Sequence, residues 1–179
     1  MNAGDDRGSK VVVFGVLDFA SLAHFYLRTD SPHEVVAFSV TRDHMPDEPT
    51  FEGLPVVPFE DVQELYSPGD HRFFVPMSHR AMNRVRRDLY TEAKLKGYDL
   101  VSYVSSHATI LIDRGAIGDN CFILEDNTVQ PFVEIGDNVV LWSGNHIGHH
   151  SVIHDHAFVT SHTVISGHCV VGASAFLGV

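Results

Sequence analysis

Residues 117–141 read IGDNCFILEDNTVQPFVEIGDNVVL, and a branched aliphatic residue occupies every sixth position of this run. The pattern continues to the end of the chain at Ile117, Ile123, Val129, Ile135, Leu141, Ile147, Ile153, Val159, Ile165, Val171 and Leu177. Neither an α-helix, with a period of 3.6, nor a simple strand, with a period of 2, repeats at six. A hexapeptide β-helix does, because each hexad forms one flat side of a triangular coil and points its aliphatic residue inward.

Three hexads complete one coil, so residues eighteen apart are expected to stack about 4.8 Å from one another. This arithmetic places Gly167 over His149, His168 over His150 and His162 over Gly144. Glycine often follows the inward aliphatic residue directly, as at Gly118. We expect these glycines to relieve backbone strain at the corners, where φ must be unusual.

Composition and charge exclude several classes of partner. The chain has 179 residues and a formal net charge of −11, so its surface repels phosphate backbones and no nucleic-acid partner is predicted. The first ten residues lack an apolar signal core, and no apolar run reaches membrane length. We therefore predict a cytoplasmic protein without a membrane partner, in which Cys121 and Cys169 are buried free thiols.

The N-terminal half alternates strand-like and helix-like segments after an expected disordered tail at residues 1–9. Buried strands are expected at residues 10–15, 34–40, 72–77 and 98–104, helices at 18–28 and 80–96, and a loop-rich segment with one short helix at 41–66. Such alternation predicts a small parallel α/β sheet with helices on its faces over residues 10–104. The β-helix domain would then occupy residues 105–179.

Ligands of parallel α/β sheets bind beyond the carboxyl ends of the strands. The expected substrate contacts in the loops at this edge are Gly15, Leu17, Asp18, Phe19 and Thr41. The first loop has no G-x-G-x-x-G pattern, so a dinucleotide site is not predicted. The alternative is that this half only braces the β-helix.

Seven of the thirteen histidines fall in one window, at positions 146, 149, 150, 154, 156, 162 and 168. His149 is expected beneath Gly167, which has no side chain to cover the ring, so a ligand could lie beside the imidazole. The Gly167 N–H is then a candidate donor to an oxyanion. Imidazole titrates near neutral pH, which suits a general base. No Ser-His-Asp or Cys-His nucleophile pattern is evident.

Three runs carry a resemblance to a known family: GYDLVSYVSSHATI (97–110), NHIGHHSVI (145–153) and ISGHCVVG (165–172). They resemble the bacterial sugar acetyltransferases of the sialic acid O-acetyltransferase family. The resemblance implies a homotrimer with acetyl-CoA bound between subunits as co-substrate. It also implies that the β-helix is left-handed and that the N-terminal domain, residues 10–104, is Rossmann-like and holds a nucleotide-linked or sialic-acid-like sugar. The family's catalytic histidine falls on His149 and its acetyl-CoA-contacting glycine on Gly167.

The chain departs from this family at several positions. His150 stands where many members have a glutamate, so it joins His149 in the expected catalytic pair. A family histidine that contacts acetyl-CoA aligns with Phe158, which leaves His156 or His162 as substitutes among the cofactor contacts. Asn145 and His146, just before the histidine run, are further expected substrate contacts. The family's Gly-rich turn is replaced by residues 15–19, and its acidic sugar contact after the second strand is absent.

The leading interpretation is a metal-free acetyltransferase in which an acceptor amine or hydroxyl, deprotonated by His149, attacks the acetyl thioester directly. One alternative is a zinc enzyme like the γ-carbonic anhydrases, with His149, His154 and Asp113 as ligands. Another is a non-catalytic trimeric scaffold. Because the repeat is still in register at Leu177, we expect a truncated form that lacks its last coils and cap.

Overall fold

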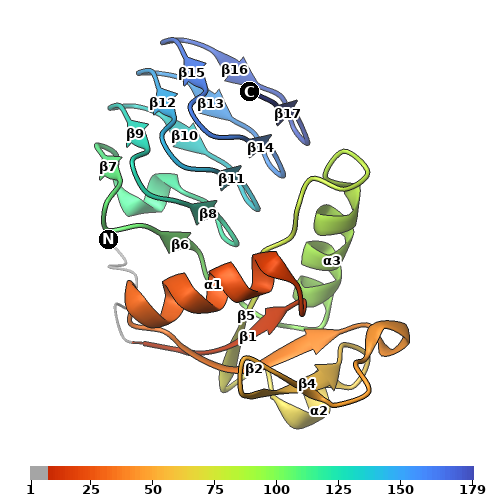
Figure 1. Cartoon of the computed structure of the whole chain (residues 1–179). Helices are drawn as coiled ribbons and strands as arrows, with labels where there is room; N and C mark the ends of the chain where they lie inside the picture. The colour runs from red at the N-terminus through yellow and green to blue at the C-terminus, as the bar shows by residue number, and fades with distance from the viewer. Residues whose placement is uncertain (1–7) are drawn as a thin grey trace. The chain divides into compact units, whose positions relative to one another are not determined.

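The computed structural model describes residues 8–179, with only the backbone described at Arg114. The chain divides into two compact units (Figure 1). The first contains the residues up to Met77 together with Leu89–Val101, and the second contains Ser78–Asp88 and Ser102–Val179. Of the predicted tail, residues 1–9, only Gly8 and Ser9 fall within the described residues. The Ser9 carbonyl already accepts a hydrogen bond from the Glu34 N–H at 2.9 Å.

The first unit is built on a five-stranded sheet in the order β3-β4-β2-β1-β5. The strands are β1 (Lys10–Phe14), β2 (Glu34–Val40), β3 (Thr50–Phe51), β4 (Leu54–Pro58) and β5 (His71–Phe74). All pairings are parallel except that of β3 with β4. The three valines of β1 are fully buried, as expected of a central parallel strand covered on both faces.

Helix α1 (Asp18–Thr29) connects β1 to β2, and α2 (Val62–Leu65) and α3 (Arg84–Leu95) follow the later strands, with a 3₁₀ turn η1 at Arg42–His44. The first three predicted strands are confirmed. The predicted loop-rich segment instead includes β3 and β4, because burial of Val56 and Val57 outweighs the two prolines of that run. No helix in residues 8–179 is long and apolar enough to cross a membrane.

Two predicted elements of the N-terminal half have different bounds. The helix expected from residue 80 begins at Arg84, because Ala81, Met82 and Asn83 take positive φ values of 52°, 54° and 63°. The strand expected over residues 98–104 is divided. Leu100 makes a single parallel bridge to Phe73, whereas β6 (Tyr103–Val104) pairs with the β-helix.

The second unit is a parallel β-helix whose two-residue strands form three sheets, ordered β10-β13-β16, β17-β14-β11-β8-β6 and β15-β12-β9-β7. Beyond β6 its strands are β7 (Thr109–Ile110), β8 (Phe122–Ile123), β9 (Thr128–Val129), β10 (Glu134–Ile135), β11 (Val140–Leu141), β12 (His146–Ile147), β13 (Val152–Ile153), β14 (Phe158–Val159), β15 (Val164–Ile165), β16 (Val170–Val171) and β17 (Phe176–Leu177). Parallel sheets with this repeat indicate the predicted left-handed β-helix.

The predicted stacking is confirmed over most of the β-helix. Each strand from β8 to β14 pairs with the strand eighteen residues later, as Leu141 pairs with Val159. The first coil has one extra residue, since Val104 pairs with Ile123, nineteen residues on. The eighteen-residue register is reached at the Ile117–Ile135 bridge, just after the 3₁₀ turn η2 (Arg114–Ala116). The inward aliphatic residues from Ile123 to Val171 are buried.

The corners follow a second six-residue pattern that was not predicted. Positive φ recurs at Asn120, Asp126, Phe132, Asn138, Gly144, His150, His156, His162, His168 and Ser174. Asn, Asp and His tolerate this left-handed conformation better than most residues, which explains why four histidines stand at successive corners. His149 is not among the positive-φ residues, so the backbone does not explain its identity.

The expected strain relief at the glycines after the aliphatic residue was wrong. Gly118 has no positive φ, and its role is to allow close approach between coils. A Cβ at Gly118 would lie 2.3 Å from the Asp137 carboxylate oxygen and 2.6 Å from the next coil's backbone.

The segment Ser78–Asp88 packs on the β-helix within the second unit. The Asn83 side-chain amide donates to the carbonyls of Ser174 and Ala175, each at 3.0 Å. The guanidinium of Arg86, fully buried, donates to the carbonyl of His156 at 2.7 Å and to that of Ala157 at 3.2 Å. Burial lowers the pKa of Arg86 to about 10, so the group remains a cation at neutral pH.

Candidate active site

His149 and Gly167 meet at one corner of successive coils. The chain leaves β12 through Gly148, and His149 then exposes its side chain. A Cβ at Gly167 would lie 2.8 Å from the His149 Cε1 atom, 2.9 Å from Nε2 and 3.1 Å from Nδ1. A Cβ at Gly148 would lie 2.4 Å from the Gly167 nitrogen. Gly148 is therefore required by space, whereas a Cβ at Gly167 would displace the exposed His149 ring. The predicted stacking of Gly167 over the His149 ring is confirmed.

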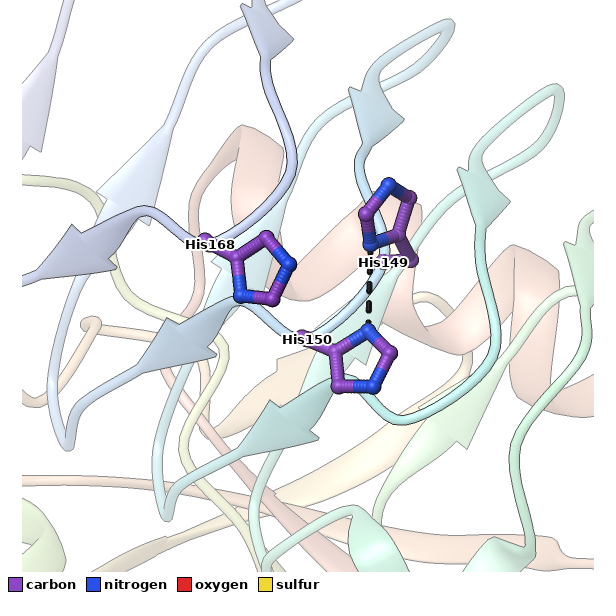
Figure 2. A group of neighbouring side chains, drawn as sticks. All are labelled: His149, His150 and His168. Carbon is purple, nitrogen blue, oxygen red and sulfur yellow. Dashed lines mark hydrogen bonds between the residues drawn. The ribbon is translucent and has the colours of Figure 1, made fainter.

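Hydrogen bonds fix the His149 backbone and orient its ring. The His149 N–H donates to the Gln130 side-chain oxygen at 2.9 Å, and the His149 carbonyl accepts from the His168 N–H at 2.9 Å. The Nδ1 atoms of His149 and His150 are 3.1 Å apart (Figure 2). One of these two nitrogens must carry a proton and the other a lone pair, so the two tautomers are linked.

His150 lies in a column of stacked rings at the same corner. Its ring centroid is 4.6 Å from that of Phe132 on the preceding coil and 4.9 Å from that of His168 on the following coil. The rings of His150 and His168 are nearly parallel, at 15°, and the His149 ring stands almost perpendicular to both. Figure 2 shows the three histidines gathered at this corner.

The three residues expected at the cofactor lie at other corners and sides of the β-helix. His156 is half-buried, its Nδ1 is 3.0 Å from the Asn138 amide nitrogen, and burial lowers its pKa. Phe158, on β14, is 4% exposed and packs against His79, with ring centroids 5.3 Å apart. His162 is exposed over Gly144, where a Cβ would lie 2.5 Å from its Nδ1. Within a single chain, these three residues do not lie beside His149.

The two expected substrate contacts before the histidine run differ in exposure. Asn145 is 1% exposed, its amide donates to the Trp142 carbonyl at 2.6 Å, and its oxygen accepts from the Thr163 N–H at 2.8 Å. These bonds use the Asn145 side chain inside the β-helix. His146, on β12, is partly exposed and precedes the inward-pointing Ile147.

The expected substrate contacts of the first unit lie where parallel pairing places them. Gly15 follows β1 with a φ of 113°, and its N–H donates to the Ser39 carbonyl at 2.8 Å. Leu17 is 76% exposed, and Asp18 and Phe19 begin α1. Thr41 follows β2, with its hydroxyl 2.7 Å from the His44 Nδ1. The five residues therefore share the carboxyl edge of β1 and β2.

Two hollows among the described residues lie away from these side chains. One, of about 580 Å³, is lined by residues 8–10 and 69–72 at the amino ends of β1 and β5. The other, of about 520 Å³, lies along β10 and β13 and is lined by residues 115–118, 134–137 and 152–154. The His149 corner is open to solvent in a single chain.

The side chains placed closely enough to share a metal ion differ from the predicted set. Within residues 8–179, the group that could do so is His149, His150 and His168, whose ligand atoms all lie within 4.8 Å of one another. It includes neither His154 nor Asp113. The stacking map already placed His168 over His150, so that residue could have been identified. It places Pro131 beneath His149, whereas Gln130 is nineteen residues before His149 and was missed.

Comparisons with known proteins agree with this architecture. Residues 116–149 match the family model "Bacterial transferase hexapeptide (six repeats)". No curated protein matches the chain.

Several solved structures are similar along nearly the whole chain. The acetyltransferase domain of PglB from Neisseria gonorrhoeae FA1090 has a TM-score of 0.68 and 16% identity, over 94% of this chain and 91% of that one. WeeI from Acinetobacter baumannii AYE has a TM-score of 0.61 and 17% identity, covering 96% and 95%. Perosamine N-acetyltransferase from Caulobacter crescentus, in complex with CoA and GDP-perosamine, has a TM-score of 0.53 and 18% identity, covering 95% and 89%. At these identities the likeness is one of fold.

Proposed function

We propose that the protein is an acetyl-CoA-dependent acetyltransferase that modifies an amino or hydroxyl group of a nucleotide-linked sugar. The observation that carries the proposal is the exposed imidazole of His149 beneath the bare backbone of Gly167. A side chain at Gly167 would displace the His149 ring, and the backbone does not require histidine at position 149. The similar structures include acetyltransferases with CoA or acetyl-CoA bound.

The residues of the corner fit direct acetyl transfer. Acetyl-CoA would supply an activated thioester, and the missing side chain at Gly167 leaves room for its acetyl group. His149 would take the proton from the acceptor as its nitrogen or oxygen attacks the carbonyl, and would return it to the departing thiolate. The Gly167 N–H donates no hydrogen bond to the described chain. It would donate to the oxyanion of the tetrahedral transition state.

His150 would act as a positioning residue for the base. If Nε2 of His149 is to accept a proton, its Nδ1 must carry the hydrogen and donate it to the Nδ1 of His150. His150 is held in turn between Phe132 and His168. A neutral imidazole would thus select the tautomer without the charge that a carboxylate would add.

The first unit would hold the acceptor as a Rossmann-like domain. The strand order of its sheet reverses at β1, since β2 and β4 lie on one side of β1 and β5 lies on the other. Ligands of such sheets bind at this switch point, beyond the carboxyl ends of the strands. Gly15, Leu17, Asp18, Phe19 and Thr41 lie at that edge. The C. crescentus neighbour is a complex with GDP-perosamine, which supports a nucleotide-linked amino sugar as the acceptor class.

A homotrimer would complete the site. His156 and His162 lie away from His149 in one chain, so they could contact the same acetyl-CoA only if a second copy packed against the first. Phe158 is buried against His79 within its own chain. The use of these two substrates would place the reaction in the cytoplasm.

The test is acetyl transfer by His149→Ala, measured as release of free CoA thiol with a panel of nucleotide-linked amino sugars. One well-placed general base contributes about 10²–10⁴-fold in rate, so turnover should fall by that factor while acetyl-CoA affinity changes little. Full activity in this variant would refute the mechanism. A loss that added zinc restores would favour a metal enzyme, and no turnover by the wild-type chain with any acceptor would favour a scaffold.

A further inference from the structure

The rings of His149, His150 and His168, which we call the histidine cluster, have the spacing of ligands to one metal ion. A tetrahedral zinc with Zn–N bonds of about 2.0–2.1 Å holds its ligand nitrogens about 3.3–3.4 Å apart. The Nδ1 atoms of His149 and His150 are already 3.1 Å apart. A nitrogen of His168 lies within 4.8 Å of the other two ligand atoms. A modest rotation of this exposed ring would close the remaining gap.

The backbone of the histidine cluster is fixed before any ion arrives. The His168 N–H donates to the His149 carbonyl at 2.9 Å, which ties the two coils together at this corner. His150 and His168 occupy equivalent corner positions, with φ values of 57° and 58°. Binding would therefore order side chains but not backbone, which limits its entropic cost.

We propose that the histidine cluster binds a divalent transition-metal ion such as Zn²⁺ through three imidazole nitrogens, with water in the remaining position. An all-imidazole set suits zinc, copper and nickel, whereas magnesium and calcium require oxygen ligands. The cluster faces solvent, and the formal net charge of −11 attracts cations to the molecule.

The ion would inhibit acetyl transfer, a consequence that rests on the proposed function. If it binds Nε2 of His149, it takes the lone pair that should accept the proton. If it binds Nδ1, the proton between the two rings moves to Nε2, which then has no lone pair. Either arrangement removes the base. Zinc at this site would therefore inhibit the enzyme, whereas the zinc of a carbonic anhydrase is catalytic.

The test is direct metal binding by the full-length chain. Zn²⁺ would be titrated into metal-free protein in competition with a chromophoric chelator, and Co²⁺ would report tetrahedral coordination through its visible absorption. The informative variant is His168→Asn, because asparagine keeps the left-handed corner and removes one ligand. The matched control is His154→Asn, which removes an exposed histidine outside the cluster.

We expect one Zn²⁺ per wild-type chain. His168→Asn should weaken binding at least 10- to 100-fold, the range seen even for groups that only support metal ligands, and His154→Asn should leave it unchanged. Equal zinc affinity in His168→Asn and the wild type would overturn the proposal, as would an equal loss in the control. Should His168→Asn fail to fold by circular dichroism, His150→Asn at the equivalent corner replaces it.

Activity gives a second readout that separates this proposal from the acetyltransferase function. Zinc should inhibit the wild-type chain, reversibly with chelator, and should require at least tenfold more metal to inhibit His168→Asn, each relative to its own metal-free rate. If no chain transfers acetyl groups but the zinc affinities differ as expected, the function fails and the metal site stands. If transfer occurs but zinc binds both chains alike, the metal site fails and the function stands.

Discussion

Gly167→Ala separates a catalytic role of the His149 corner from a structural one. The added Cβ would lie 2.8 Å from one ring atom of His149 and 2.9 Å from another. Ordinary contact requires about 3.5 Å or more, so the exposed ring must retreat by about 0.5–1 Å. Because a solvent-exposed side chain can move, the free energy of unfolding should change by less than about 1 kcal/mol.

Catalysis should respond more strongly than stability. A misplacement of about 1 Å can cost on the order of 100-fold in rate, which corresponds to about 2.7 kcal/mol in the activation free energy. We therefore expect kcat/KM of Gly167→Ala to fall about 100-fold while its Tm changes by a few degrees at most. The assay is acetyl transfer followed by thiol release, with thermal unfolding measured on the same preparation.

Two controls make the result decisive. Gly148→Ala places its Cβ 2.4 Å from the Gly167 backbone nitrogen, which cannot rotate away, so this variant should lose about 1–3 kcal/mol of stability. In a His149→Ala background, Gly167→Ala should lower the rate by a smaller factor than it does alone, because the ring it displaces is gone and only the loss of room for the acetyl group remains. Wild-type kcat/KM in Gly167→Ala, or full additivity of the two substitutions, would refute the argument.

Three further perturbations test the second unit. Arg86→Ala leaves two carbonyls without their charged donor and should lower the free energy of unfolding by about 2–5 kcal/mol in urea titration, whereas a loss below 0.5 kcal/mol would contradict the packing. Burial lowers the pKa of His156, so the unfolded chain binds the proton more readily, and the free energy of unfolding should decline as pH falls below about 6.5. His156→Asn should make this decline with pH less steep. An equally steep decline in the variant would show that His156 is not its source. Gly144→Ala places a Cβ at a φ of 78° and 2.5 Å from the His162 ring, so it should lower the free energy of unfolding by about 1–3 kcal/mol, measured by thermal unfolding. Adding His162→Ala should restore only the part of this loss that is due to the ring. Complete restoration would show that the positive φ does not contribute.

The sequence predicted the β-helix and the meeting of His149 with Gly167 because both depend on a period that repeats along one dimension. Once Leu141 and Val159 are known to be one coil apart, every neighbour between coils follows by counting. The same count fails in the first coil, where one extra residue enters before Ile117. A single extra residue leaves no repeating pattern in the sequence by which it could be predicted.

The N-terminal half was harder to predict because its contacts follow no period. Val56 and Val57 form a strand despite flanking prolines, since burial decides and local propensity does not. Arg86 falls within the helix predicted at residues 80–96, but it is buried against the β-helix. Its partners are backbone carbonyls, which every residue has, so no pattern of side chains predicts the contact.

The packing of Ser78–Asp88 on the β-helix also constrains the order in which the protein can be assembled during synthesis. Asn83 leaves the ribosome 91 residues ahead of the Ser174 carbonyl that it binds. At about 5–20 residues per second, that interval is roughly 5–18 s. The coils can form one after another as they emerge, since each pairs with the coil made just before it. The guanidinium of Arg86 must stay hydrated until residue 157 has emerged, so this segment docks only after its coils exist, and a ribosome-stalled chain ending before residue 156 should leave it accessible to protease.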